Sequence, residues 1–283
     1  MNGMKTFVLM MVMTFIFLIL GNALGGSQGV IIAFIFALVT NFISYWFSDK
    51  IVLSMYRAVP LTEGTSDGRR VFGIVRELVR EADLPMPTLY KIGEAQPNAF
   101  ATGRNPEHAA VVVTEGILRV MDDNELSGVL AHELGHVHNR DILISSVAAV
   151  MASAISFLST MARWGAITGG RSRRRNNNGI ILLVLAIFAP IAAMLVRLAI
   201  SRAREYKADD FSAKITKNPM FLANALTNLE SQTQRIPMDA NPATENMFIV
   251  SPLSGSSFAT LFSTHPPIKE RINRLIQMDR TEL

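Results

Sequence analysis

The chain contains no cysteine, so neither a disulfide bond nor a thiolate metal site can form in it. Any transition-metal site must therefore use histidine and carboxylate side chains. Charged residues are scarce as well, at 18% of the 283 residues, whereas hydrophobic residues reach 49% and the mean hydropathy is +0.29. A chain of this length and hydropathy is expected to combine one soluble domain with membrane-spanning segments.

The charges that are present are mainly basic, with a net charge of +4 and an isoelectric point of about 9.6. Nucleic-acid-binding proteins are often basic, but the sequence contains none of the recognition motifs of the known DNA-binding and RNA-binding modules. Membrane proteins are also often basic, because Lys and Arg collect at their cytoplasmic flanks. We therefore expect a lipid bilayer, and no nucleic acid, as a partner.

The N-terminal region is predicted to form a transmembrane hairpin. Two apolar runs, Phe7–Ala23 and Val30–Phe47, are separated only by a short Gly-rich segment. The alternative for the first run is a cleaved signal peptide, which the second run, following so closely, argues against. Lys5 before the hairpin, and Lys50 and Arg57 after it, place both flanks in the cytoplasm by the positive-inside rule.

A second pair of apolar stretches, Ile142–Ala162 and Ile180–Val196, encloses a segment with several arginines and no acid. Hydropathy predicts two further membrane crossings, which would leave these arginines outside, against the positive-inside rule. A packed hairpin that enters the bilayer incompletely is the alternative, because the first stretch is rich in serine and the second carries Pro190.

The rest of the chain is expected to form a catalytic domain in two halves. A helical periodicity around Arg70–Ala82 and a β-rich run, Ala109–Thr114, lie in the first half, and an amphipathic helix ends the second. The predicted organisation is a transmembrane hairpin, a first catalytic half, a second apolar hairpin with an arginine-rich tip, and a second catalytic half, at residues 1–47, 48–141, 142–200 and 201–283.

The pattern H-E-x-x-H, formed by His132, Glu133 and His136, is the strongest chemical signal. Asp122, with Glu125 three residues later, predicts the start of a helix through this segment. Histidines four residues apart share one helix face and can reach one ion. Glu133 is then placed to take a proton from metal-bound water. The motif alone is moderately specific, because a surface helix can carry the same residues for solubility.

The third metal ligand has to come from elsewhere. His138 points to nearly the opposite side of the helix from His136, and the metzincin pattern fails because Asn139 and Ile142 stand where it needs Gly and His. A downstream carboxylate remains: Glu205 can bind the metal, with Asp209 one turn later accepting the outer N–H of a ligand histidine. The alternative for this segment is a solvated charged helix.

Taken together, these elements resemble the HtpX-like membrane proteases and, more widely, the glutamate-ligand zincins typified by thermolysin. The resemblance covers nearly the whole chain and rests on five segments in order, in addition to the N-terminal hairpin: Asn98–Gly103, Ala109–Gly116, His132–His136, Ser201–Asp209 and Thr264–Pro267. It implies an α+β, mainly helical zincin fold with transmembrane helices and a small β-sheet whose edge strand binds substrate.

The resemblance also implies a function. The expected protein is a zinc endopeptidase with one Zn²⁺ per chain, located in the bacterial inner membrane with its catalytic domain in the cytoplasm. It would serve membrane protein quality control by cleaving misfolded or damaged membrane proteins, with Glu133 as the general base.

On the same resemblance, the strand Ala109–Thr114 would be the edge to which substrate adds, through Ala109, Val111 and Val113, with Asn98 close by. Ordinary sheet core is the alternative for this strand. His265 would polarise the scissile carbonyl or stabilise the oxyanion, unless it simply precedes the last helix.

Two rival functions remain to be weighed. An intramembrane metalloprotease would have to bury the charged residues that flank the H-E-x-x-H motif, which is prohibitive. A catalytically silent scaffold or holdase that keeps zinc for stability is the second rival, and the intact Glu133 argues against it.

No Pro or Gly follows Gly135 before Gly165, so the metal-binding helix is expected to continue toward the bilayer.

Overall fold

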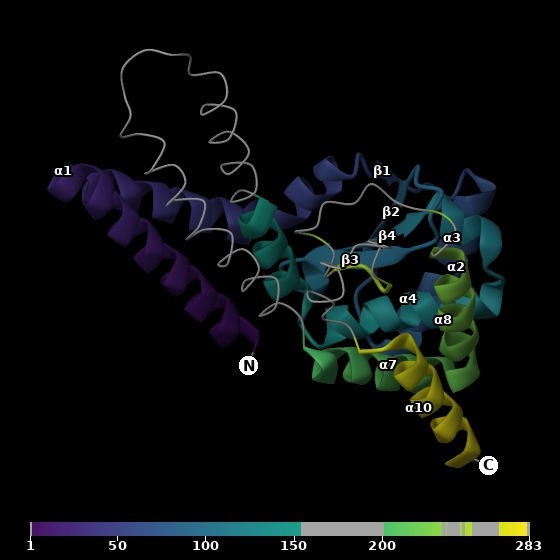
Figure 1. Cartoon of the computed structure of the whole chain (residues 1–283). Coiled ribbons are helices and arrows are strands. Elements are labelled where there is room, and N and C mark those ends of the chain that lie inside the picture. The colour runs from purple at the N-terminus through teal and green to yellow at the C-terminus, as the bar shows by residue number, and fades with distance from the viewer. Residues whose placement is uncertain are drawn as a thin grey trace.

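The computed structural model describes residues 2–153, 201–233, 236, 244, 247–250 and 266–281. The arginine-rich tip, the second apolar stretch and His265 lie outside the described residues. Helices and strands below are named as labelled in Figure 1.

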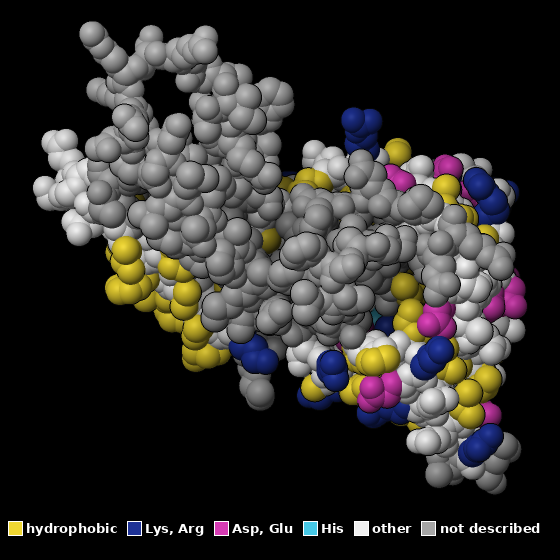
Figure 2. Space-filling view, viewed as in Figure 1, with side chains coloured by type: hydrophobic (Ala, Val, Ile, Leu, Met, Phe, Trp, Pro, Cys, Tyr) yellow, Lys and Arg dark blue, Asp and Glu magenta, His cyan; other side chains and the backbone are white. Residues whose placement is uncertain are grey.

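Helix α1, Asn2–Met55, consists of two arms because the backbone leaves helical geometry at Gly25 and Gly26. The arms contact each other: the Asn41 side chain donates to Thr14 Oγ1 at 2.9 Å. Figure 1 shows the chain folding back on itself at this point. Hydrophobic side chains gather along the N-terminal arm in Figure 2, whereas the opposite end of the molecule displays Lys, Arg, Asp and Glu.

The second arm, Gly25–Met55, is long and apolar enough to cross a membrane, and only 11% of its most apolar window is buried within the protein. The apolar part of the first arm, Gly3–Ile19, is shorter. Because so little of this surface is covered by protein, many large apolar side chains of α1 are exposed on the outside of the fold.

Four strands form one mixed sheet in the order β1-β2-β4-β3. β4 pairs in parallel with β2 and antiparallel with β3. The prediction that Ala109–Thr114 is an edge strand is therefore wrong, because this strand, β4, has a partner along both sides. The edge strands of the described sheet are β1 and β3. The four strands are Val59–Pro60, Thr88–Ile92, Ala99–Gly103 and Ala109–Thr114.

Helix α4 lies between the sheet and α7, and α8 packs against it as well (Figure 1). Close packing depends on Gly128, since a Cβ atom there would lie 2.5 Å from the backbone nitrogen of Leu222 in α8. The labelled α-helices that follow α1 in the described part of the chain are α2, α3, α4, α7, α8 and α10, which span Ser66–Ala82, Glu115–Val120, Asp123–His138, Arg202–Thr216, Pro219–Thr233 and Ile268–Thr281.

Both ends of α4 are fixed by hydrogen bonds. At the start, Asp122 and Glu125 form the predicted capping box, each side chain accepting from the other's backbone N–H. At the end, Arg140 takes a left-handed conformation with φ 56°. The backbone N–H of Asp141 then reaches the carbonyl of His136 at 2.9 Å, which closes the helix.

The prediction that the metal-binding helix continues toward the bilayer is therefore wrong. Helix α4 ends at His138, and a separate apolar helix, Ile142–Ser153, begins three residues after Asn139. Arg140 adopts the left-handed conformation that glycine usually adopts at helix ends, so no glycine or proline marks this helix end in the sequence. The turn has a second effect, because it brings Asp141 back beside His136.

Candidate metal centre

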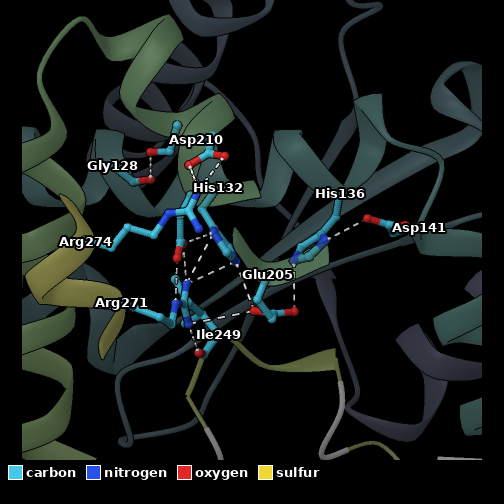
Figure 3. A network of polar contacts seen from close by, with 11 residues as sticks. Gly128, His132, His136, Asp141, Glu205, Asp210, Ile249, Arg271 and Arg274 are labelled. Atoms are coloured by element: carbon cyan, nitrogen blue, oxygen red, sulfur yellow. Dashed lines mark hydrogen bonds and ion pairs between the residues drawn. The ribbon is translucent and has the colours of Figure 1, made fainter. Parts of the chain in front are cut away.

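The structure brings together the three side chains predicted to hold a metal. One ligand atom each from His132, His136 and Glu205 lies within 4.8 Å of the others. The Nε2 atoms of His132 and His136 are 3.7 Å and 3.6 Å from the two carboxylate oxygens of Glu205. Figure 3 shows both imidazoles, from α4, directed toward the Glu205 carboxylate, from α7.

These distances fit a divalent metal ion. Ligands about 2.1 Å from a tetrahedral Zn²⁺ are about 3.4 Å apart, close to the separations between Glu205 and the two histidines. Two imidazoles and one carboxylate are also the donor set of catalytic zinc sites, in which the fourth position is left open. The side chains at this centre therefore fit zinc both in spacing and in chemistry.

A second carboxylate orients each histidine. Asp209, which has no exposed surface, places Oδ1 2.9 Å from Nδ1 of His132, the contact expected from its position one turn after Glu205. Asp141, which the sequence reasoning missed, places Oδ2 3.4 Å from Nδ1 of His136. With Nδ1 engaged in this way, both rings direct Nε2 at the metal position.

Glu133 is 1% exposed and lies beside the ligands. Burial, followed by the nearby charge of Glu205, raises its pKa to about 8, although His136, Arg271 and a backbone hydrogen bond from Ala101 act in the opposite direction. A divalent cation at the centre would add positive charge next to this carboxyl group and favour its ionised form. Glu133 is thus positioned to exchange a proton near neutral pH.

Arg271 is a further component of the site that the sequence reasoning missed. This arginine, from α10, has no exposed surface and donates from Nε and Nη2 to Asp209 at 3.0 Å and 2.7 Å. Figure 3 shows Arg271 closer to His132 than to His136. Although burial opposes ionisation, the Arg271 guanidinium and His132 hold the pKa of Asp209 below its usual range.

The two ligand histidines differ in their protonation. Burial and then the charge of Arg271 lower the pKa of His132 to about 4, so this imidazole is neutral at physiological pH, as a metal ligand must be. Burial also acts to lower the pKa of His136, but the hydrogen bond with Asp141 and the charges of Glu205 and Glu133 raise it to about 9.

The remaining predicted site residues lie elsewhere. Ala109, Val111 and Val113 are buried in β4, in the middle of the sheet. Asn98 is also buried, and its amide group donates to the carbonyl of Val250 at 2.9 Å.

The edge strand nearest the site is β3. Its Ala101 supplies the backbone hydrogen bond to Glu133, and its Ala99 carbonyl accepts from the N–H of Ile249 at 3.3 Å. Ile249 in turn accepts a hydrogen bond from Arg271 at 3.2 Å. The edge of β3 is therefore joined to the metal centre by hydrogen bonds, whereas β4 has a strand along both of its sides.

The fold and the centre define a metallopeptidase with an H-E-x-x-H helix and a carboxylate third ligand. Comparison with known proteins agrees: residues 66–279, from α2 to within α10, match the model of peptidase family M48. The chain therefore belongs to peptidase family M48, and its relatives in that family are named as HtpX homologues.

Two of these relatives illustrate the similarity. The protease HtpX homolog of Syntrophobacter fumaroxidans is 55% identical over 279 residues, which cover 97% of this chain and 98% of that protein. The protease HtpX homolog of Campylobacter hominis is 51% identical over 284 residues, covering 99% and 100% of the two chains.

A solved structure is similar in fold. The crystal structure of S. mikatae Ste24p superposes with a TM-score of 0.53 at 16% sequence identity. The match covers 97% of this chain and 65% of that chain, so this chain spans less than two thirds of that longer relative. At this identity the likeness concerns the fold alone.

Proposed function

We propose that this protein is a zinc-dependent endopeptidase of membrane protein quality control, which cleaves misfolded or damaged membrane proteins on the cytoplasmic side of the bacterial inner membrane. The observation that carries the proposal is the convergence of His132, His136 and Glu205 within 4.8 Å, directly beside the buried Glu133. Membership of peptidase family M48 supports the peptidase activity.

In this mechanism His132, His136 and Glu205 would hold a Zn²⁺ ion. When bound, such an ion would supply Lewis-acid chemistry, lowering the pKa of a water molecule to about 7 and polarising the scissile carbonyl. Glu133 would accept the proton of the attacking water and deliver it to the leaving amine, because a cation beside this buried carboxyl group favours its ionised form. His265 would donate a hydrogen bond to the developing oxyanion.

We place the substrate along β3 in place of the strand first expected. Main-chain pairing with an edge strand holds many sequences in an extended form, as a quality-control enzyme requires. The N–H of Ile249 already occupies the carbonyl of Ala99, so a substrate strand that uses this carbonyl has to displace Ile249.

Membrane anchorage is supported by the second arm of α1, which is apolar, long enough to span a bilayer and mostly uncovered. Lys50 and Arg57 follow the apolar part of this arm, which by the positive-inside rule supports a cytoplasmic catalytic domain. This location brings the metal centre near membrane proteins that expose unfolded cytoplasmic segments.

Casein cleavage by the full-length protein in detergent with added zinc tests the proposal. The wild type and a Glu77→Gln control, altered on the exposed face of α2, should cleave casein. Glu133→Gln should lose nearly all activity while retaining one zinc per chain. Equal cleavage by Glu133→Gln would overturn the mechanism, and a zinc-loaded wild type that never cleaves would point to a scaffold or holdase instead.

A further inference from the structure

A cavity lies where the second arm of α1 meets the loop after β3. Its volume is about 570 Å³, and it is lined by Phe42, Trp46, Phe47, Asp49, Lys50, Arg104 and His108. The first five of these residues belong to α1, and the last two belong to the loop and the short 3₁₀ helix Pro106–His108 before β4. The membrane helix and the catalytic domain therefore each form one wall.

The α1 wall of this cavity is aromatic and exposed. The ring centroid of Phe42 lies 6.3 Å from that of Trp46 and 6.4 Å from that of Phe47. The side chains of Phe42, Trp46 and Phe47 are 58%, 44% and 40% exposed. The cluster stands at the end of the apolar run, just before the first charged residues, Asp49 and Lys50. Aromatic side chains are enriched at this level of a membrane helix, where lipid headgroups begin.

Two cations lie over these rings. Lys50 Nζ is 5.6 Å from the centroid of Phe47, and the guanidinium carbon of Arg104 is 4.9 Å from that of Trp46. Within the described part of the chain, neither cation has a carboxylate oxygen within 4.0 Å. Asp49 is the one acid in the lining, so positive charge predominates in the cavity.

We infer that this cavity binds the headgroup of an anionic phospholipid, with the phosphate between Lys50 and Arg104 and the acyl chains along the exposed apolar side of α1. The cavity is continuous with the surface proposed to face the bilayer, which favours a lipid over a soluble phosphate compound. The inference rests on the membrane anchorage in the proposed function, and on no step of the proposed catalysis.

The bound lipid would act as a bridge between the membrane helix and the catalytic domain. Arg104 directly follows Gly103, the final residue of β3, and the same strand holds the backbone group of Ala101 that contacts Glu133. A phosphate that binds both Arg104 and Lys50 therefore fixes the active-site edge strand relative to α1. The composition of the surrounding membrane would set how firmly the domain is docked.

Tryptophan fluorescence can test the site, because the chain has only two tryptophans, Trp46 and Trp164. The full-length Trp164→Phe protein in detergent is titrated with phosphatidylglycerol or phosphatidylcholine carrying brominated acyl chains, which quench Trp46 on contact. Half-maximal quenching should need several-fold less phosphatidylglycerol. Lys50→Ala and Arg104→Ala should each weaken this preference on the order of fivefold, whereas Arg104→Lys should retain most of it.

Arg57→Ala is the matched control, since Arg57 follows the same arm of α1 but does not line the cavity. An unchanged melting temperature and zinc content would show that each variant is folded. Equal quenching by the two lipids, or an unchanged preference in Lys50→Ala and Arg104→Ala, would overturn the lipid site and leave anchorage standing. Displacement of phosphatidylglycerol by glycerol 3-phosphate would also overturn it. Failure of both lipids to quench would instead refute anchorage itself.

Discussion

Arg271 donates two hydrogen bonds to Asp209, Nε to Oδ2 at 3.0 Å and Nη2 to Oδ1 at 2.7 Å, and neither side chain is exposed to solvent. Asp209 in turn contacts Nδ1 of His132 at 2.9 Å. A buried carboxylate that loses its cation is strongly destabilising, whereas an exposed ion pair contributes little. The pair therefore stabilises the fold and the orientation of a metal ligand at the same time.

Replacement of Arg271 by Met should lower the free energy of unfolding by about 3–5 kcal/mol, because Asp209 would remain as an uncompensated buried charge. Arg274→Met, on the same helix, breaks a half-exposed pair with Asp210 and should cost about 1 kcal/mol or less. Thermal and denaturant unfolding of both variants in detergent provides the comparison. Similar small losses in the two variants would contradict the stabilising role assigned to Arg271.

The carboxylates behind the histidines should control metal affinity. Asp209→Asn and Asp141→Asn should each weaken zinc binding by about 10-fold to 100-fold. The larger effect is expected at Asp209, whose contact with its histidine is 2.9 Å, compared with 3.4 Å at Asp141. Competition with a chromophoric chelator measures the affinity. Asp210→Asn, beside Asp209 but half-exposed, should bind zinc like the wild type.

Zinc binding should release protons at pH 7. The pKa of His136 is raised to about 9, so its imidazole carries a proton that the metal must displace, whereas His132, with a pKa of about 4, is already neutral. Glu133, with a pKa of about 8, should also lose its proton beside the cation. Apparent affinity should therefore rise with pH up to about pH 9 and then level off.

Calorimetry in buffers of different ionisation enthalpy counts these protons. The wild type should release between one and two protons per zinc, and Glu133→Gln about one, because only His136 then titrates. A release that is independent of Glu133 would contradict the raised pKa of this residue. A flat affinity between pH 6 and pH 8 would contradict that of His136.

Two glycines on helices should respond in opposite ways to alanine. Gly128→Ala should destabilise the protein, because its Cβ would lie 2.5 Å from the backbone of Leu222 and force α4 and α8 apart. Gly73→Ala, in α2, meets no atom within 4 Å and should stabilise the protein by about 1 kcal/mol through helix propensity. Thermal unfolding of the two variants tests both signs, and destabilisation in both would contradict the packing argument.

Much of the metal centre could be predicted from the sequence because its geometry is local. The spacing of His132 and His136 on one helix determines a shared face, and Glu205 with Asp209 repeats this on another. In a chain without cysteine, the third ligand had to be a histidine or a carboxylate. The convergence of these two helices was the one long-range assumption, and the structure confirms it.

The sheet order could not be predicted in the same way. The composition of β4 suits an edge strand and an internal strand equally well. Its internal position in the sheet results from pairing with β3 along one side and with β2 along the other. Such pairings join segments through backbone groups that every residue carries, so side-chain identity says little about them. The edge strand next to the metal centre is therefore Ala99–Gly103, and not Ala109–Thr114 as predicted.

Asp141 and Arg271 were missed for separate reasons. Asp141 reaches His136 only because α4 ends in a left-handed turn at Arg140, without a glycine to mark it. Arg271 occupies the apolar face of α10, between Ile268 and Leu275 at helical spacing. An arginine on the buried face of an otherwise regular amphipathic helix was the signal that could have identified it, since such a residue needs a buried partner.

The distance along the chain between His132 and Arg271, 139 residues, has a consequence for biosynthesis. A ribosome that has just produced the H-E-x-x-H helix must still add α7, which holds Glu205 and Asp209, and then the first turn of α10, which holds Arg271. Until then the nascent polypeptide carries two imidazoles without their carboxylate partner. The order of synthesis therefore delays completion of the metal centre until almost the whole chain has been made.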